Sequence, residues 1–508
     1  RMQNTYQFIS DKGVFSLPGA ADYSDLYFPV AGECGIKSAV TPTLGGDCKL
    51  DQNTFLLEPV SVENLHNNRN ARNFWCHIGT HGSWSATGNS AEEIAKNFTD
   101  LADENEVTAG FMWQTVTRTS RKYQLSAQIT SFVPLDDPME IMYVEITNTG
   151  NMQVRFTPTA AIPVYGRSAD NLRDHRHVTS LHRIRTVENG VLVTPTMSFD
   201  ERGHRPNEMT YFVCGYDQTG EAPEDFYPTV QDFIGEGGNF ERPKAVVKNL
   251  AGVPAGSAYA GCEAVGGLHF KERTLAPGET AGYTIMIGAV RKTEHAGETI
   301  LSMTAAYRKA AQTKAAYERM KTYWEQKVNV SYHTKDRRFD RYMQWVSFQP
   351  ILRRIYGCSF LPHHDYGKGG RGWRDLWQDC LALLLMNPDG VREMLLNNFQ
   401  GVRIDGTNAT IIGSKEGTFI ADRNQITRVW MDHGVWPFVT TKLYIDQTGD
   451  LAVLEEEIPY FKDQQAGRGT KKDAAWKEQD GCWQRDAAGN VYRGSVLEHL
   501  LLQNLTAF

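Results

Sequence analysis

Residues 366–380 read YGKGGRGWRDLWQDC, and the chain continues as LALLLMNP to residue 388. Four glycines lie within residues 367–372, where they allow the backbone to bend and to approach a ligand closely. The apolar run that follows predicts a helix over residues 374–386, which Asn387-Pro388 would end. The sequence therefore predicts a glycine-rich loop that leads into the first turn of a helix.

Polar side chains follow one face of this predicted helix. Asp375, Gln378 and Asp379 would share that face, because their spacing matches the helical repeat. Arg371 and Arg374 lie just before or inside its first turn. In one interpretation the acidic residues complement the helix dipole and pair with the arginines. In the other, the row of polar groups lines a ligand site that opens from the loop.

Composition and charge indicate an ordinary globular protein of two or more domains. The chain has 508 residues, of which 41% are hydrophobic and 22% charged, with a net charge of −7. This charge gives no electrostatic case for nucleic acid or an anionic membrane. No pair of cysteines has CxxC spacing, which favours free thiols in a reducing cytoplasm over disulfides or a zinc site. The eight cysteines are Cys34, Cys48, Cys76, Cys214, Cys262, Cys358, Cys380 and Cys482.

The N-terminal half is predicted to be a large antiparallel β-sandwich over residues 1–295. Apolar and polar residues alternate in several runs, and turn residues such as Asn, Gly, Asp and Pro separate the runs. Many antiparallel strands over so long a stretch favour a sandwich. The strands are expected at 122–133, 140–147, 152–163, 190–193, 210–214 and 282–288.

The remainder is predicted to be helical. Linker helices are expected over residues 296–335, mainly as one long helix at 300–327, where Gly and Pro are absent. Residues 336–508 are interpreted as the first helices of an (α/α)6 barrel. Within that region helices are expected at 336–356, 374–386, 388–400, 431–446, 451–460 and 495–508.

The last predicted helix, residues 495–508, is strongly apolar and has neither a Gly cap nor a polar tail. A barrel of about twelve helices also needs more residues than follow Asp336. The expectation from these two features is that the chain is the N-terminal part of a longer enzyme, and that a C-terminal segment or second chain completes the barrel.

Residues 370–379, GRGWRDLWQD, resemble the cellobiose phosphorylase family, glycoside hydrolase family 94, whose members carry Arg-Gly, then an aromatic residue with Arg-Asp, then Gln-Asp. Residues 430–436, WMDHGVW, resemble the family's acidic pair followed by Trp, and residues 448–450 resemble its next turn. Residues 456–460 and 495–499 resemble the segments that precede its catalytic loop. The order of a sandwich, linker helices and a helical barrel agrees as well.

The resemblance implies reversible inverting phosphorolysis of a β-glucoside to a sugar 1-phosphate, with inorganic phosphate as substrate and no cofactor. It implies that Arg371, Arg374 and Asp375 bind the hydroxyls of the glucosyl unit. Asp432 and His433 are candidates for a polar sugar contact, an acid/base pair or a helix cap. The family's proton donor is the Asp of an Asp-Trp-Asn-Asp motif that is absent from the chain, so no catalytic residue is assigned and the acid is expected beyond Phe508. The family's habit also implies a homodimer.

The phosphate site departs from the family pattern. The loop between Arg371 and Arg374 is shorter, and the family's upstream Ser-Arg-Ser has no match in residues 356–364. Lys368 and His364, with His363, are the nearest basic groups. Adjacent histidines point in different directions, so His363-His364 is not interpreted as a metal site.

Two other functions remain open from the sequence. An inverting glycoside hydrolase on the same helical scaffold would need a second carboxylate as base and would not need phosphate. A non-catalytic carbohydrate-binding fragment is the other alternative. Release of sugar 1-phosphate in the presence of phosphate would separate the first from phosphorolysis.

Overall fold

The computed structural model describes residues 5–22, 26–60, 69, 71–172, 178, 181–200, 203–357, 371–412, 419–420 and 432–507. Within these residues the chain forms two compact units. The first unit holds the described residues up to 326 together with 334–342, and the second holds 327–333 and the described residues from 343 onward.

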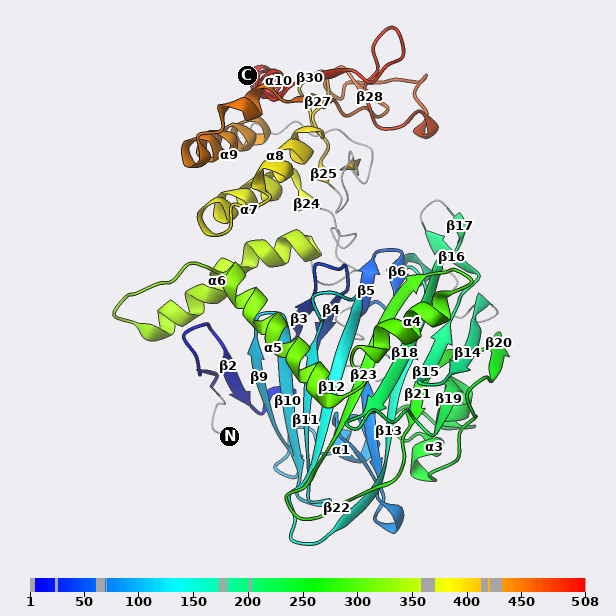
Figure 1. Ribbon diagram of the computed structural model, residues 1–508. Coiled ribbons are helices and arrows are strands. Elements are labelled where there is room, and N and C mark those ends of the chain that lie inside the picture. The colour runs from blue at the N-terminus through cyan, green and yellow to red at the C-terminus, as the bar shows by residue number, and fades with distance from the viewer. Residues whose placement is uncertain are drawn as a thin grey trace. The chain divides into compact units, whose positions relative to one another are not determined.

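The first unit is built on an eleven-stranded antiparallel sheet. Figure 1 shows its long strands side by side, with α4 (Ala296–Ala305) and α5 (Ala310–Lys327) crossing one face. The strand order is β1 (Gln7–Phe8), β2 (Phe15–Pro18), β9 (Glu104–Gly110), β10 (Trp113–Ser120), β11 (Leu125–Phe132), β12 (Met139–Asn148), β23 (Thr280–Arg291), β18 (Met209–Asp217), β15 (Gly190–Val193), β14 (Arg183–Val187) and β20 (Ala258–Ala260).

A six-stranded sheet forms the second layer. Its order is β19 (Asp225–Thr229), β21 (Ala264–His269), β13 (Val154–Val164), β7 (Asn73–His77) and β8 (Ser83–Ser85), with β22 (Arg273–Leu275) paired to β13. Smaller elements complete the unit: β3 (Phe28–Ala31), β4 (Lys37–Val40), β5 (Cys48–Asp51), β6 (Thr54–Phe55), β16 (Met197–Asp200), β17 (Gly203–Pro206), α1 (Ala91–Ile94), α2 (Val230–Ile234) and α3 (Lys244–Val247).

The core lies between the two large sheets. Val107, Ile129 and Val144 from the eleven-stranded sheet share one apolar cluster with Phe74 and Leu268 from the six-stranded sheet. Successive side chains of a strand alternate between its faces, so one face of each sheet is apolar and packs on the other sheet. The described N-terminal region is therefore a large antiparallel β-sandwich, as the alternation in the sequence predicts.

The strand predictions are confirmed. Each of the six predicted runs overlaps a strand of the structure. In chain order these strands are β11, β12, β13, β15, β18 and β23. The ends of the predicted runs differ by a few residues, because pairing with neighbouring strands determines where a strand stops.

The prediction of one long helix at 300–327 is wrong, because α4 and α5 are separated by a turn over residues 306–309. The Tyr307 hydroxyl donates to Asp137 at 2.6 Å, and the Arg308 side chain donates to the Gly220 carbonyl at 2.7 Å. Gln312 accepts from the backbone N–H of Lys309 at 2.9 Å, which caps the start of α5. These bonds favour a break where the residue propensities alone favour a continuous helix.

The second unit is mainly helical. Its helices are the C-terminal part of α6 (Arg337–Tyr356), α7 (Trp373–Met386), α8 (Val391–Phe399), α9 (Asp432–Thr448) and α10 (Val496–Ala507). Short strands join them: β24 (Arg371–Gly372), β25 (Ile411–Ile412), β26 (Phe419–Ile420), β27 (Glu457–Pro459), β28 (Gln465–Ala466), β29 (Lys471–Lys472) and β30 (Arg493–Ser495).

The helices predicted at 336–356, 374–386, 431–446 and 495–508 are confirmed within one or two residues by α6, α7, α9 and α10. The helix predicted at 388–400 begins three residues later, so Pro388 lies in the preceding turn instead of the first helical turn. Gly390 has a left-handed φ of 78° at the start of α8. Asn387 and Pro388 therefore belong to the segment that connects α7 to α8.

The helix predicted at 451–460 is wrong. The segment forms one 3-10 turn, η6 (Leu451–Glu455), and then the strand β27, which pairs with β30. Arg392 bonds to Asp450 at 3.0 Å and to Glu456, and so holds both ends of η6. Ile458 is buried while Glu457 is exposed, which is a strand pattern that three residues are too few to reveal.

Candidate functional site

The start of α7 is fixed by a switch from strand to helix in the second unit. Gly372 is the last residue of β24, which pairs with β25, and the Trp373 N–H donates to the Thr410 carbonyl at 3.1 Å. A Cβ atom on Gly372 would come within 2.6 Å of an Asp375 carboxylate oxygen. The absence of a side chain at 372 therefore lets the Asp375 carboxylate lie against the turn.

Arg353, near the end of α6, binds the two acidic residues of the α7 face. One of its nitrogens lies 3.1 Å from an Asp375 oxygen, and its Nε lies 2.8 Å from an Asp379 oxygen. The Asp379 side chain is 8% exposed, whereas the Asp375 side chain is 42% exposed. Asp379 is thus a buried anchor for Arg353, while Asp375 keeps an accessible carboxylate.

A second ion pair joins the starts of α7 and α9. The Arg374 Nε lies 2.6 Å from a carboxylate oxygen of Asp432, and the Trp436 indole N–H donates to the same oxygen at 3.3 Å. The side chain of Arg374 is 47% exposed and that of Asp432 is 34% exposed. This pair is also open to a ligand.

His433 links α9 to the turn before β25. Because proline has no N–H, Pro437 cannot bond to the His433 carbonyl four residues earlier. The Trp373 indole N–H donates to that carbonyl at 3.0 Å instead. The proline within α9 therefore frees an acceptor that ties this helix to the start of α7.

The imidazole of His433 is neutral at physiological pH. Burial lowers its pKa to about 4, and the positive charge of Arg374 acts in the same direction while Asp432 opposes it. Its Nδ1 lies 3.1 Å from Oδ1 of Asn408, whose Nδ2 donates to the Ala409 carbonyl. Nδ1 therefore carries the proton and donates to Asn408, which fixes the tautomer.

A buried ion pair holds Asn408 in turn. Arg403 is 3% exposed and pairs with Asp463 at 2.9 Å and 3.0 Å. Its remaining guanidinium nitrogen donates to the Asn408 carbonyl at 2.7 Å and to the Thr407 hydroxyl at 3.3 Å. The polar network thus extends from the start of α7, through His433 and Asn408, to the buried pair of Arg403 and Asp463.

The structure brings together four of the residues singled out in the sequence: Arg374, Asp375, Asp432 and His433. Of Arg371 it describes the backbone in β24, and Lys368 and His364 lie outside the described residues, as does His363.

Sequence reasoning missed Arg353, Asn408 and the Arg403–Asp463 pair. The sequence does offer one signal for Arg353: two adjacent arginines, Arg353 and Arg354, lie at the end of the helix that precedes the glycine loop.

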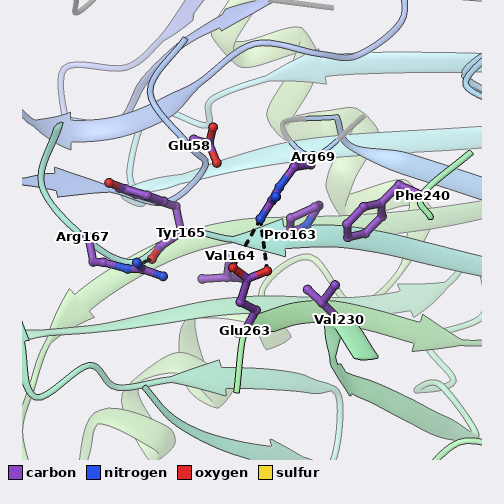
Figure 2. Close-up of a pocket in the computed structure, with 10 residues that line it drawn as sticks. Glu58, Arg69, Pro163, Val164, Tyr165, Arg167, Val230, Phe240 and Glu263 are labelled. Atoms are coloured by element: carbon purple, nitrogen blue, oxygen red, sulfur yellow. Dashed lines mark hydrogen bonds and ion pairs between the residues drawn. The ribbon is translucent and has the colours of Figure 1, made fainter. Parts of the chain in front are cut away.

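The sandwich contains a separate small cavity of about 40 Å³, shown in Figure 2. Arg69 and Glu263 form an ion pair across it at 3.1 Å, and Tyr165 and Arg167 line the wall beside them. Its charges balance, and its volume suits one or a few water molecules. This cavity does not have room for a sugar substrate.

The described residues contain no group of three or more His, Cys, Asp or Glu side chains placed to hold a metal ion. Among those same residues, no helix is long and apolar enough to cross a membrane. Seven cysteines lie in the described part of the chain, and none of these seven is in a disulfide bond.

Comparison with known families places both regions of the chain. Residues 68–309 match the supersandwich domain of glycosyl hydrolase 94, and residues 323–470 match the catalytic domain of the glycosyl hydrolase 94 superfamily. The sandwich and the helical region thus define a class of two-domain proteins in which a supersandwich precedes a helical catalytic domain. The chain belongs to the glycosyl hydrolase 94 family.

Two of the curated relatives that the chain resembles are phosphorylases. The N,N'-diacetylchitobiose phosphorylase of Vibrio furnissii is 25% identical over 356 residues, which are 65% of this chain and 42% of that protein. The solabiose phosphorylase of Paenibacillus borealis is 24% identical over 354 residues, 68% of this chain and 40% of that protein. The matched region spans less than half the length of either relative.

Among solved structures, a bacterial glucoamylase complexed with acarbose covers 87% of this chain and 57% of its own, at 10% identity and a TM-score of 0.48. That likeness is too low to support an inference about function.

Proposed function

We propose that this protein catalyses the reversible, inverting phosphorolysis of a β-glucoside, a disaccharide or short oligosaccharide. Phosphate would attack the anomeric carbon from the side opposite the leaving oxygen while an acid protonates that oxygen. The glycosidic bond then breaks, and a sugar 1-phosphate of inverted configuration is released. Two curated relatives, named as phosphorylases of N,N'-diacetylchitobiose and of solabiose, support phosphorolysis of a disaccharide in general.

One observation carries the proposal: two arginine–carboxylate pairs lie at the starts of α7 and α9 and are still open to solvent. The Asp375 and Asp432 side chains are 42% and 34% exposed, although each is paired with an arginine. Sugar hydroxyls can donate to such carboxylates in charge-assisted hydrogen bonds. A site of paired polar groups discriminates strongly against sugars that lack a matching hydroxyl.

The roles proposed for single residues follow from their chemistry. Asp375 and Asp432 accept hydrogen bonds from hydroxyls of the sugar, and Arg371 and Arg374 donate to its oxygens. His433 is neutral and is proposed as a polar contact to the sugar. Lys368 and His364 remain proposed for phosphate on the basis of the sequence.

The helical region is proposed to be part of an (α/α)6 barrel. A groove of about 370 Å³ between α9, η6 and α10 is lined mainly by apolar side chains, among them Phe438, Leu497 and Leu501. Further helices, from a continuation of the chain or from a second chain, are proposed to cover this face. A homodimer and a reducing, cytoplasmic location are also proposed, both on the basis of the sequence.

The experiment measures sugar 1-phosphate release from a panel of disaccharides, including cellobiose, N,N'-diacetylchitobiose and solabiose, with and without phosphate. Reverse synthesis from glucose 1-phosphate and N-acetylglucosamine 1-phosphate with a panel of acceptors identifies the linkage formed. Product that depends on phosphate supports the proposal. Free sugar formed equally well without phosphate would indicate a hydrolase, and binding without turnover would indicate a carbohydrate-binding role.

A further inference from the structure

The outward face of the sandwich carries polar as well as aromatic side chains where a helix covers it. On β10 and β11, Val116, Leu125 and Ile129 point into the core. The opposite face carries Thr115 and Thr130, which are directly paired across the two strands. A helix-covered face normally presents apolar residues for burial, and these two hydroxyls depart from that pattern.

Helix α5 crosses this face of the sheet, as Figure 1 shows. Thr313 of α5 exchanges a hydrogen bond of 3.0 Å with Thr284 of β23. The Tyr317 ring packs edge-on against Trp113 and Phe132 at 5.6 Å and 5.5 Å between ring centres. These contacts hold the helix to the sheet at two places.

Between them lies a groove of about 240 Å³. Among its lining residues are Thr115, Gln128, Thr130, Tyr143, Glu145 and Tyr317. All of the lining residues belong to the first unit, so the groove is formed within the sandwich and its covering helix.

The polar groups of the groove are held in place by one another. Lys314 of α5 lies 2.7 Å from a Glu145 oxygen and 5.4 Å above the ring centre of Tyr143. The Tyr143 hydroxyl lies 3.4 Å from the same Glu145 oxygen, and Thr115 and Thr130 share a hydrogen bond of 2.8 Å. The site is therefore largely organised before any ligand arrives, which lowers the entropic cost of binding.

The lining chemistry excludes several classes of ligand. Lys314 pairs with Glu145, and Lys321 pairs with Glu318, the other carboxylate of the lining, so neither carboxylate is left without a counter-charge that would oppose phosphate or attract a cation. Hydroxyls, an amide and two tyrosine rings instead match a ligand with many hydroxyl groups and flat apolar faces. The groove, at about 240 Å³, is smaller than the pockets of 300–1,000 Å³ that hold drug-sized ligands. It is therefore suited to a smaller ligand, such as a single sugar ring.

We propose that this groove is an accessory binding site for one ring of a neutral saccharide. Tyr143 and Tyr317 provide apolar ring surface, and Thr115, Thr130 and Gln128 exchange hydrogen bonds with sugar hydroxyls. The site is separate from the start of α7 in sequence and in composition, and it does not depend on the function proposed there.

Hydrogen–deuterium exchange, read by mass spectrometry, tests the proposal. The protein is titrated with glucose, N-acetylglucosamine, cellobiose and N,N'-diacetylchitobiose in a variant carrying Asp375→Asn, which weakens the proposed sugar site at α7. At least one saccharide is expected to slow exchange in β10–β12 and α5. Because each substitution removes one hydrogen bond, Thr130→Val and Gln128→Ala are expected to raise the Kd for this effect by about 3- to 10-fold each.

The chain offers a matched control on the same two strands. Thr119 and Ser126 share a hydrogen bond of 3.0 Å on the same face but do not line the groove. Ser126→Ala is therefore expected to leave the saccharide effect within about twofold, a difference below that of one hydrogen bond.

The proposal is overturned if no saccharide of the panel protects β10–β12 and α5, or if Ser126→Ala weakens protection as much as Thr130→Val. Loss of protection on dilution of the protein at fixed saccharide would instead indicate contact between copies, and would also overturn it.

Discussion

At the scale of single residues, the Asp375 carboxylate is held by Arg353 at 3.1 Å and still has 42% of its side chain exposed. If it accepts a charge-assisted hydrogen bond from a sugar hydroxyl, Asp375→Asn removes the charge and keeps the shape. The expected loss in kcat/KM for phosphorolysis is about 10²-fold, while the fold is retained because Arg353 keeps Asp379. Steady-state kinetics with the best disaccharide of the panel measure this loss.

Asp446→Asn is the control for this variant. Asp446 lies on α9 and pairs with Lys442, and both side chains are more than half exposed. Activity within about twofold of the parent is expected there, since exposed ion pairs contribute little. Near-parental activity of Asp375→Asn would refute the sugar-binding role.

The lowered pKa of His433 predicts that the free energy of unfolding depends on pH. Its ordinary pKa of 6.5 falls to about 4 on folding because burial opposes the charged form. Between these values the unfolded chain binds a proton that the folded chain does not, so stability falls as the pH drops from 6.5 toward 4. The contribution of His433 to this loss is roughly 3 kcal/mol.

Urea unfolding at several pH values measures the effect. His433→Gln should unfold with a shallower dependence on pH over this window than the parent protein. His81→Gln is the control, because His81 is exposed. Equal slopes for the parent and His433→Gln would contradict the buried, neutral state of His433.

How much of the candidate site could be predicted is also visible at this scale. Arg374 and Asp375 were predicted because a local motif, a glycine loop before a helix, marks them. Arg353, 22 residues before Asp375, and Asn408 were missed because their roles depend on contacts between separate elements. Such contacts leave no periodic pattern in the sequence.

At the scale of elements, alternation predicted the long strands well, since one buried face imposes a period of two. The break between α4 and α5 was missed because Tyr307 and Arg308 bond to the sandwich, and these bonds outweigh helix propensity. The strand β27 was missed because its pairing partner, β30, lies more than thirty residues later. The β-propensities of the three residues in β27 carry no information about a partner strand so far along the chain.

A buried ion pair links the two sheets of the sandwich. Arg72 precedes β7 of the six-stranded sheet, Glu140 lies in β12 of the eleven-stranded sheet, and both side chains are fully buried. Arg72 also donates to the Asp47 carbonyl at 2.8 Å. Because Arg72→Met would leave the Glu140 carboxylate buried and unpaired, it should lower the free energy of unfolding by about 3–5 kcal/mol.

Urea denaturation of Arg72→Met and of Arg291→Met measures this difference. Arg291 pairs with Glu208 on the surface, with 79% and 73% of the side chains exposed, so a loss below about 1 kcal/mol is expected. Where Arg72→Met does not fold, Glu140→Gln provides the milder test of the same pair. Similar losses for the buried and the surface pair would refute the role assigned to the bridge.

At the scale of the whole molecule, an exposed apolar surface lies in the second unit, on α9 and α10. Phe438, Leu497, Leu501 and Leu505 are between 46% and 69% exposed. The first three line the apolar groove of about 370 Å³. Each Å² of apolar surface left in water costs about 25 cal/mol, and surfaces of this kind commonly mark sites of association.

This surface predicts that the chain binds the apolar dye ANS and self-associates through α10. Leu497→Lys combined with Leu501→Lys should lower dye fluorescence by roughly half or more and shift sedimentation toward the monomer, because charge interrupts the patch. Stability should be retained, since both side chains already lie about half in water.

Leu101→Lys is the control, because Leu101 is 78% exposed but lies in the sandwich unit, outside the groove. If the double variant and Leu101→Lys reduce dye binding equally, the groove is not the association surface. The proposal that further helices cover it would then lose its physical basis.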